Sequence, residues 1–198
     1  KLKKLGVNVL YYVAPQAWVW KPWRSKVLQK NVHTLFTILP FEKEWFSNRG
    51  VTNIKSVIHP LMTEYKENLR EIRKRSSNDF DARPVKILLL PGSRNVEVAK
   101  LLPIFINGIK ILKEEGLELD LGIVKAESVN PENYELASEI TNIWNSDELV
   151  SAIDWADMSV AASGTVTLAT GLFALPTLVC YQVSLATEFL FKLFLPYD

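Results

Sequence analysis

The sequence predicts an α/β protein whose sheets are mostly parallel and whose chain divides into two domains. Apolar runs of strand length alternate along the chain with amphipathic stretches of helical period, which is the pattern of strands joined by crossover helices. The apolar runs are continuous rather than alternating with polar residues, as is typical of strands buried on both faces. The sign of the charge also changes along the chain, which indicates two domains with different partners.

The predicted elements follow one another along nearly the whole sequence. Strands are expected over residues 7–13, 35–39, 54–58, 86–90, 119–124, 158–162 and 177–181. Helices are expected over residues 96–115 and 147–155, where the apolar residues recur with helical period. No run contains the ~20 apolar residues that a helix needs to cross a bilayer. Both ends of the sequence are expected to be cut from a longer chain.

Charge divides the chain into a basic and an acidic half. Residues 1–86 carry 17 Lys and Arg against 7 Asp and Glu, whereas residues 87–198 carry 6 against 15. A nucleic acid, a phosphorylated lipid and an anionic membrane are all partners that the basic half could meet. The polar stretch at residues 65–83 coincides with the change of sign. The predicted domains are a partial amino-terminal domain over residues 1–75, a linker over 76–85 and a second domain over 86–198.

A small-residue loop follows the predicted strand at residues 86–90 and opens a helix. Gly92 permits close approach of a ligand to the backbone, Ser93 can donate its hydroxyl, and Arg94 can hold a phosphate with two hydrogen bonds. The alternative is an ordinary strand-to-helix loop in which Ser93 caps the helix and Glu97 is an acid of its first turn. Spacing alone leaves both interpretations open.

A second loop of small residues follows the predicted strand at residues 158–162. Ser163, Gly164 and Thr165 lie where the carboxyl end of a parallel strand meets a helix, and ligands of open α/β sheets bind at that edge. Two such loops on one sheet could converge on one diphosphate. Neither loop matches a Walker motif or GxGxxG, so a P-loop NTPase and a standard dinucleotide-binding domain are not expected.

Tryptophans and cations are interleaved near the amino terminus, at Trp18, Trp20, Lys21, Trp23, Arg24 and Lys26. Such a segment can lie at a lipid headgroup layer, or its rings can stack on sugars or bases. The remaining alternative is that the tryptophans belong to the core and the cations to a solvated face. His33 and His59 are isolated in the sequence, and no metal site is expected.

Five segments, in this order, carry a resemblance to one family. They are Tyr11–Trp20, Ile38–Glu42, His59–Leu61, Leu90–Glu97 and Ala162–Thr165. Together they resemble the lipid-A-disaccharide synthase family, and they extend over nearly all of the chain. The resemblance implies a GT-B architecture, in which two Rossmann-like domains hold the active site in the cleft between them.

The resemblance also implies a reaction. A 2,3-diacylglucosamine unit passes from UDP to 2,3-diacylglucosamine 1-phosphate, UDP is released, and the β-1,6-linked disaccharide of lipid A forms with inversion. No cofactor and no metal are expected, because arginine and helix N-termini neutralise the leaving diphosphate in such folds. The implied location is cytoplasmic, peripheral on the inner face of the bacterial inner membrane. The partners are the two lipid substrates and an anionic membrane surface, with no nucleic acid, and a homodimer is left open.

The resemblance assigns roles to the motif residues. Arg94 is expected to stabilise the charge of the leaving group. The expected donor-binding residues are Gly92, Ser93, Arg94, Glu97, Ser163, Gly164 and Thr165. The expected acceptor-side and membrane-side residues are Trp18, Trp20, Lys21, Trp23, Arg24 and Lys26.

The sequence departs from the family at two motif positions. Ala169 stands where the family has a glutamate that resembles a ribose ligand, and Ile58 stands where a glycine usually precedes His-Pro. We therefore expect weaker donor binding than in relatives, and tighter binding in an Ala169→Glu variant. The general base is expected to lie outside this chain, which alone should be inactive. The alternatives are another UDP-sugar GT-B enzyme, such as an epimerase or a peptidoglycan transferase, and a catalytically silent lipid-binding relative.

Overall fold

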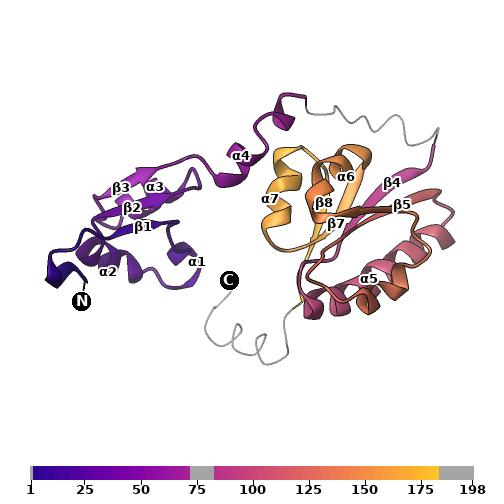
Figure 1. The fold of residues 1–198 in the computed structure, drawn as a ribbon, viewed down its shortest axis with the longest axis horizontal. Coiled ribbons are helices and arrows are strands. Elements are labelled where there is room, and N and C mark those ends of the chain that lie inside the picture. The colour runs from indigo at the N-terminus through magenta and orange to yellow at the C-terminus, as the bar shows by residue number, and fades with distance from the viewer. Residues whose placement is uncertain (1, 72–82, 183–198) are drawn as a thin grey trace. The chain divides into compact units, whose positions relative to one another are not determined.

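The computed structural model describes residues 2–71 and 83–182, which form two parallel sheets. Contacts divide the described residues into two compact units, one ending at residue 65 and the other beginning at residue 66 (Figure 1). Most of the linker expected at residues 76–85 lies outside the described residues, so the predicted domain limits stay a prediction. In the described part of the chain, no helix is both long enough and apolar enough to cross a membrane.

The first unit holds a three-stranded parallel sheet in the order β1-β2-β3. Its elements are β1 (Leu10–Tyr12), α1 (Ala17–Trp20), α2 (Arg24–Asn31), β2 (Thr34–Thr37), α3 (Glu42–Ser47), β3 (Ile54–Ser56) and α4 (Pro60–Glu64), with a 3-10 turn at Leu2–Leu5. Leu28 of α2, Leu35 of β2 and Phe46 of α3 belong to one buried cluster. Helices α2 and α3 therefore pack on the same face of this sheet.

The second unit holds a five-stranded parallel sheet in the order β6-β5-β4-β7-β8. Its strands are β4 (Val85–Leu90), β5 (Leu119–Lys125), β6 (Asn142–Asn145), β7 (Met158–Ala162) and β8 (Thr177–Cys180). Its helices are α5 (Asn95–Glu114), α6 (Leu149–Trp155) and α7 (Thr165–Leu172), with 3-10 helices at Asn68–Glu71, Pro131–Ala137 and Ser146–Glu148. From the central strand β4 the chain first adds β5 and β6 on one side of the sheet and then β7 and β8 on the other, as in Rossmann-like folds.

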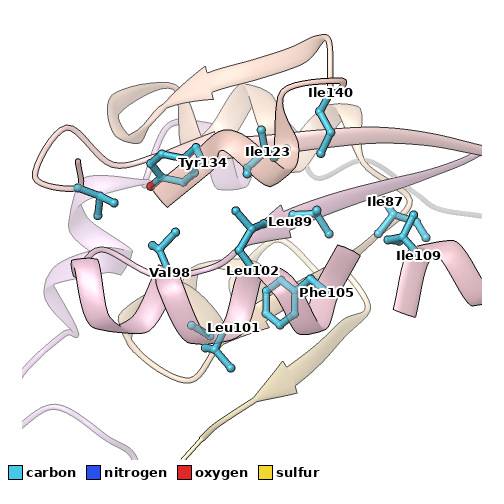
Figure 2. Close-up of a cluster of buried hydrophobic side chains, with 13 residues drawn as sticks. Ile87, Leu89, Val98, Leu101, Leu102, Phe105, Ile109, Ile123, Tyr134 and Ile140 are labelled. Carbon is cyan, nitrogen blue, oxygen red and sulfur yellow. The ribbon is translucent and has the colours of Figure 1, made fainter. Parts of the chain in front are cut away.

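Both faces of the central strand β4 of the second sheet are covered. Ile87 and Leu89 of β4 pack against α5, as Figure 2 shows, within a buried cluster. Leu88 and Leu90 alternate with them along the strand and are equally buried, so they lie under the opposite layer. Helix α5 lies on one side of the sheet in Figure 1, and α6 and α7 lie on the other.

Position 122 of β5 has room only for a glycine. A β-carbon at this position would lie 2.6 Å from the Trp144 ring and 2.8 Å from the Trp155 ring. These two rings pack against each other with centroids 5.1 Å apart. The glycine therefore lets the tryptophans of β6 and α6 pack directly on the backbone of the sheet.

The α/β class and the parallel sheets confirm the sequence prediction, and each predicted strand and helix matches an observed one within a few residues. Strand β6 was not predicted, because it is short and has an asparagine at each end. The prediction that all apolar runs are buried on both faces is wrong for β1, whose three residues are exposed. It is also wrong for β8, in which Leu178 is 59% exposed and Val179 is 50% exposed. In the described part of its sheet β1 is an edge strand, paired with β2 alone.

Candidate functional site

The two loops singled out in the sequence lie side by side at the carboxyl edge of the second sheet. Strands β4 and β7 are paired in parallel, with Leu90 opposite Ala161. The loop at 91–94 follows β4, and the loop at 163–164 follows β7. The strand order reverses between β4 and β7, and this is the point at which open α/β sheets bind ligands. The structure thus brings the two predicted donor-binding loops together.

The β4–α5 loop contains a glycine with positive φ and an ion pair between Arg94 and Glu97. Gly92 has a φ of +118°, which L side chains rarely adopt. The Nη1 of Arg94 donates a hydrogen bond to Oε1 of Glu97 at 2.6 Å. The Arg94 side chain is nevertheless 79% exposed. The loop therefore holds a cation at the start of α5 in a position open to solvent.

The alternative that Ser93 caps α5 is wrong. Arg94 occupies the N-cap position with an extended backbone, and no side chain of the described residues caps this helix. Ser93 lies one residue earlier and is exposed. The first N–H groups of α5 carry the positive end of the helix dipole, so the uncapped start of α5 favours an anion.

A third loop, between β5 and the 3-10 helix at Pro131–Ala137, supports the first. The Ser128 hydroxyl donates to the carbonyl of Ser93 at 2.8 Å. The Oδ1 of Asn95 accepts from the backbone N–H of Asn130 at 2.8 Å and from Nδ2 of Asn133 at 2.9 Å. Sequence reasoning missed these residues. The available signal was that Ser128 and Asn130 follow the carboxyl end of a parallel strand, as the predicted site residues do.

Tyr134 fixes the base of this third loop. Its ring is buried in the core beside α5 (Figure 2), and its hydroxyl accepts a hydrogen bond from the N–H of Ala126 at 3.0 Å. Burial raises the pKa of Tyr134, and the hydrogen bond from Ala126 acts in the opposite direction. The phenol is therefore neutral at physiological pH and serves as a structural acceptor.

The β7–α7 loop places Ser163, Gly164 and Thr165 at the surface. The Ser163 N–H donates to the carbonyl of Cys180 at 2.8 Å, which ties the loop to the end of β8. The Thr167 hydroxyl donates to the carbonyl of Gly164 at 2.7 Å. As for α5, no side chain in the described part of the chain caps the start of α7. Two uncapped helix starts therefore face the same edge of the sheet.

A small pocket of about 80 Å³ lies where these loops meet. It is lined by Val96, Glu97, Lys100, Leu101, Ala162, Ser163, Tyr181 and Gln182. Pockets that enclose a ligand are several times larger, at roughly 300–1,000 Å³. This pocket is therefore too small to enclose a nucleotide. The described residues contain no group of three or more His, Cys, Asp or Glu side chains that could hold a metal ion.

The predicted acceptor-side residues do not form one exposed strip. Trp23 is 59% exposed and Lys26 is exposed, whereas Lys21 and Arg24 are half-buried. The side chain of Trp20 is not among those that the structure describes. Trp18 is half-buried, and its indole N–H donates to the Glu42 carboxylate at 3.3 Å.

Glu42 is a residue whose role the sequence did not reveal. Its carboxylate is buried and accepts hydrogen bonds from the backbone N–H groups of Ile38 at 3.1 Å and Leu39 at 3.0 Å, besides the Trp18 indole. Trp18 also packs edge-to-face on Phe41, with ring centroids 5.1 Å apart. One carboxylate therefore holds together the segments that follow β1 and β2.

Position 169, where the family has a glutamate, is buried at the inner face of α7. Ala169 is only 1% exposed, while Thr165, one turn earlier, lies exposed at the start of α7. A glutamate at position 169 would begin in packed protein interior. The tighter donor binding expected of an Ala169→Glu variant stays a prediction, and it requires that this buried position admit a glutamate.

Residues 1–197 match the family model described as Lipid-A-disaccharide synthetase. The lipid-A-disaccharide synthase of Francisella philomiragia is 32% identical over 198 residues, which cover 96% of this chain and 51% of that enzyme. Lipid-A-disaccharide synthase 1 of Legionella pneumophila strain Paris is 32% identical over 191 residues, which cover 93% and 49%. This chain thus spans about half the length of the curated relatives that it matches. By the match to the family model over almost its whole length, the chain belongs to the lipid-A-disaccharide synthetase family.

Proposed function

We propose that the chain carries the donor-binding site of an inverting glycosyltransferase of lipid A biosynthesis. In this reaction 2,3-diacylglucosamine passes from UDP to 2,3-diacylglucosamine 1-phosphate, and the β-1,6-linked disaccharide forms as UDP leaves. Family membership supports the reaction class. The observation that carries the site is the pairing of β4 with β7, which sets two uncapped helix starts side by side at the switch point of the sheet.

The loops supply charge to a leaving diphosphate. The N–H groups at the starts of α5 and α7 are preorganised donors, and they carry the positive ends of the helix dipoles. Arg94 is exposed, so its guanidinium can turn from Glu97 to the diphosphate, and Glu97 restrains it until the donor binds. One preorganised charge at a leaving diphosphate lowers the barrier by about 3 kcal/mol, or ~100-fold in rate.

The β5 loop is proposed to position the first loop. Ser128 and Asn95 link the two loops through hydrogen bonds that are independent of Arg94 itself. Removing these bonds would loosen the backbone of Ser93 without deleting any group that contacts the donor. Preorganisation of this kind matters because small displacements of a charge at a reacting bond reduce the rate.

The first unit is proposed to face the acceptor and the membrane. Its exposed Trp23 and Lys26 suit a headgroup layer of anionic lipid. The proposed whole is a GT-B enzyme with domains over residues 1–75 and 86–198, peripheral on the cytoplasmic face of the inner membrane. The general base is proposed to come from the part of the fold that this chain does not span.

A second candidate is a relative that binds the lipid without transferring sugar. The observation that favours it is Ala169, which stands in place of a family glutamate and is buried within α7. Such a protein would keep the surface of the first unit and bind the donor weakly or not at all.

Thermal unfolding of the chain with UDP separates the two candidates. A ligand at 100 times its dissociation constant stabilises the folded state by about 2.7 kcal/mol, which raises the melting temperature by several degrees for a unit of this size. We expect UDP to raise the melting temperature, with no rise for NAD at the same concentration. A melting temperature that millimolar UDP leaves unchanged favours the silent relative.

A further inference from the structure

His59 has no role in the proposed donor site, yet its ring is held in place by the chain. It is the N-cap residue of α4 and has an extended backbone. Nδ1 of its imidazole accepts a hydrogen bond from the backbone N–H of Leu61 at 3.2 Å. A side-chain acceptor at the N-cap commonly satisfies an N–H group of the first helical turn. The imidazole here does what serine, threonine, asparagine or aspartate does at most helix starts.

This hydrogen bond determines which nitrogen of the neutral ring carries the proton. A backbone N–H can only donate, so Nδ1 has no proton and Nε2 has one. In the part of the chain that the structure describes, Nδ1 is the only nitrogen of this ring with a hydrogen bond. Among the described residues, Oδ1 of Asn53 is the one buried side-chain polar atom without a partner, so Nε2 of His59 is accessible. The Nε2–H group is therefore a donor on a held ring that a ligand can reach.

His59 lies at the carboxyl edge of the first sheet. Strands β2 and β3 are paired in parallel, with Thr37 opposite Ser56. The N–H of Val57 extends this pairing by donating to the carbonyl of Thr37 at 2.9 Å, and His59 follows two residues later. Ligands of open parallel sheets bind at the carboxyl edge. The ring of His59 is thus placed where the first unit would bind its part of the substrates.

The segments that leave the three strands at this edge carry no charge. Residues 13–17, 38–41 and 57–60 contain no Lys, Arg, Asp or Glu. They expose two large apolar side chains, Phe41 at 47% and Ile58 at 70%. A phosphate is typically bound by arginine or lysine, which these segments lack. A neutral donor that follows an exposed isoleucine suits a neutral oxygen attached to a hydrocarbon chain, as in an acyl group.

We propose that Nε2–H of His59 donates a hydrogen bond to an acyl carbonyl oxygen of the acylated glucosamine acceptor, and that Ile58 lies against the start of the acyl chain. The hydrogen bond to Leu61 orients the donor before the lipid binds, which lowers the cost of ordering it. Ile58 stands where the family usually has a glycine, so the apolar contact is a feature of this chain. The inference rests on the proposed function, which supplies the acceptor, but it involves neither Arg94 nor the donor loops.

Two substitutions separate the helix cap from the ligand donor. His59→Asn keeps a side-chain acceptor for the Leu61 N–H, because asparagine is a favoured N-cap residue, and removes the Nε2–H group. His59→Ala removes both. The probe is 2,3-dihexanoylglucosamine 1-phosphate, and glucosamine 1-phosphate is its match without acyl groups. We expect His59→Asn to melt like the wild type and to bind the acylated probe roughly fivefold more weakly, the loss typical of one neutral hydrogen bond.

Two further variants complete the comparison. His59→Ala should melt at a lower temperature than the wild type, besides binding the acylated probe more weakly. Ile58→Gly, which restores the usual family residue, should weaken binding of the acylated probe and leave that of glucosamine 1-phosphate unchanged.

Long-range ¹H–¹⁵N NMR spectra of the imidazole nitrogens give a readout that a helix cap alone would not change. In the free chain we expect an unprotonated Nδ1 and a protonated Nε2 in His59. Addition of the acylated probe should shift the Nε2 signal. His33, the other histidine of the chain, is the internal control and should not respond.

Equal affinity of the wild type and His59→Asn for the acylated probe would overturn the proposal and leave His59 as a helix cap. A His59 Nε2 signal that millimolar probe leaves unchanged would overturn it as well. An equal loss of affinity for glucosamine 1-phosphate would overturn the assignment to the acyl carbonyl. UDP binding tests the donor site separately, so a chain that binds UDP and fails these tests loses only the role of His59. Binding of the acylated probe that depends on His59, in a chain that does not bind UDP, would count against the donor site alone.

Discussion

A β-carbon placed on Gly92 would lie 2.8 Å from Oε2 of Glu97 and 2.9 Å from its Cβ. The loop between β4 and α5 can therefore close only if position 92 has no side chain. Glu97 in turn accepts a hydrogen bond from Arg94 at 2.6 Å. Glu97 therefore lies against both the glycine turn and the cation of this loop.

Gly92→Ala should destabilise the second unit by about 1–3 kcal/mol, because the substitution adds a clash to a positive φ. UDP affinity should fall as well, since the loop must move. Gly108→Ala is the matched control, because Gly108 lies in α5 and a β-carbon placed on it would meet no heavy atom within 4 Å. In the control, stability should rise by about 0.5–1 kcal/mol. Urea unfolding and UDP titration measure both effects, and a Gly92→Ala variant as stable as the wild type would show that the loop is not tightly packed.

Glu42→Ala should destabilise the first unit by roughly 3 kcal/mol, because it leaves the Trp18 indole and two backbone N–H groups without their buried acceptor. Glu44→Ala is the control, since Glu44 belongs to the same helix and is exposed. Urea unfolding gives the stability of each variant. The indole N–H resonance of Trp18 should also move in the first variant and stay in place in the second. Equal stability of the two variants would contradict the role assigned to the carboxylate.

The combined variant Lys21→Gln, Arg24→Gln and Lys26→Gln should bind vesicles of anionic phospholipid less tightly than the wild type. The difference should be larger at low salt, because exposed charges are then less screened. Lys110→Gln with Lys113→Gln removes two exposed cations of α5 and serves as the control. Sedimentation with vesicles measures the bound fraction. Unchanged partitioning of the triple variant at low ionic strength would return these cations to an ordinary solvated face.

Ala169→Glu should destabilise the second unit by ~3 kcal/mol, because it brings a charge and a longer side chain into a packed position. This cost opposes the gain in donor binding that the family glutamate suggests. Leu168→Glu, at the exposed neighbouring position, should be close to neutral. Melting curves and UDP calorimetry on both variants decide the matter. A stable Ala169→Glu protein with tighter UDP binding would restore the ribose role.

The second sheet was predictable from sequence because its central strands are long apolar runs, which Leu88 and Leu90 exemplify. Strand β6 was not predictable in the same way, since Trp144 packs against Trp155 only after the sheet has formed. Leu10 and Tyr12 form a strand as predicted, but they are exposed and not buried. An apolar pattern indicates which residues a strand could bury, and it does not show which other elements are present to cover them.

Part of the candidate site was predictable from the sequence, because its loops follow predicted strands directly. Gly92 and Ser163 are marked by their places at strand ends, and the adjacency of their loops follows from the Rossmann-like order. The hydrogen bonds of Asn95 to Asn130 and Asn133 join residues 35 and 38 positions apart and have no local signature. The acceptor role of Glu42 towards Trp18 likewise depends on two loops meeting in three dimensions.

Calorimetric titration of UDP and of uridine against the chain, its Arg94→Gln variant and a Lys110→Gln control tests the proposed donor site most directly. The comparison isolates the diphosphate, because uridine lacks it. Arg94 and the two helix starts should make UDP bind more tightly than uridine in the wild type and in the control. Arg94→Gln should lose roughly tenfold or more in UDP affinity, since a charge-assisted hydrogen bond contributes about 1.5–3 kcal/mol, and should bind uridine as before. Equal affinities of wild type and Arg94→Gln for UDP, or no preference of the wild type for UDP over uridine, would contradict a diphosphate site at the switch point.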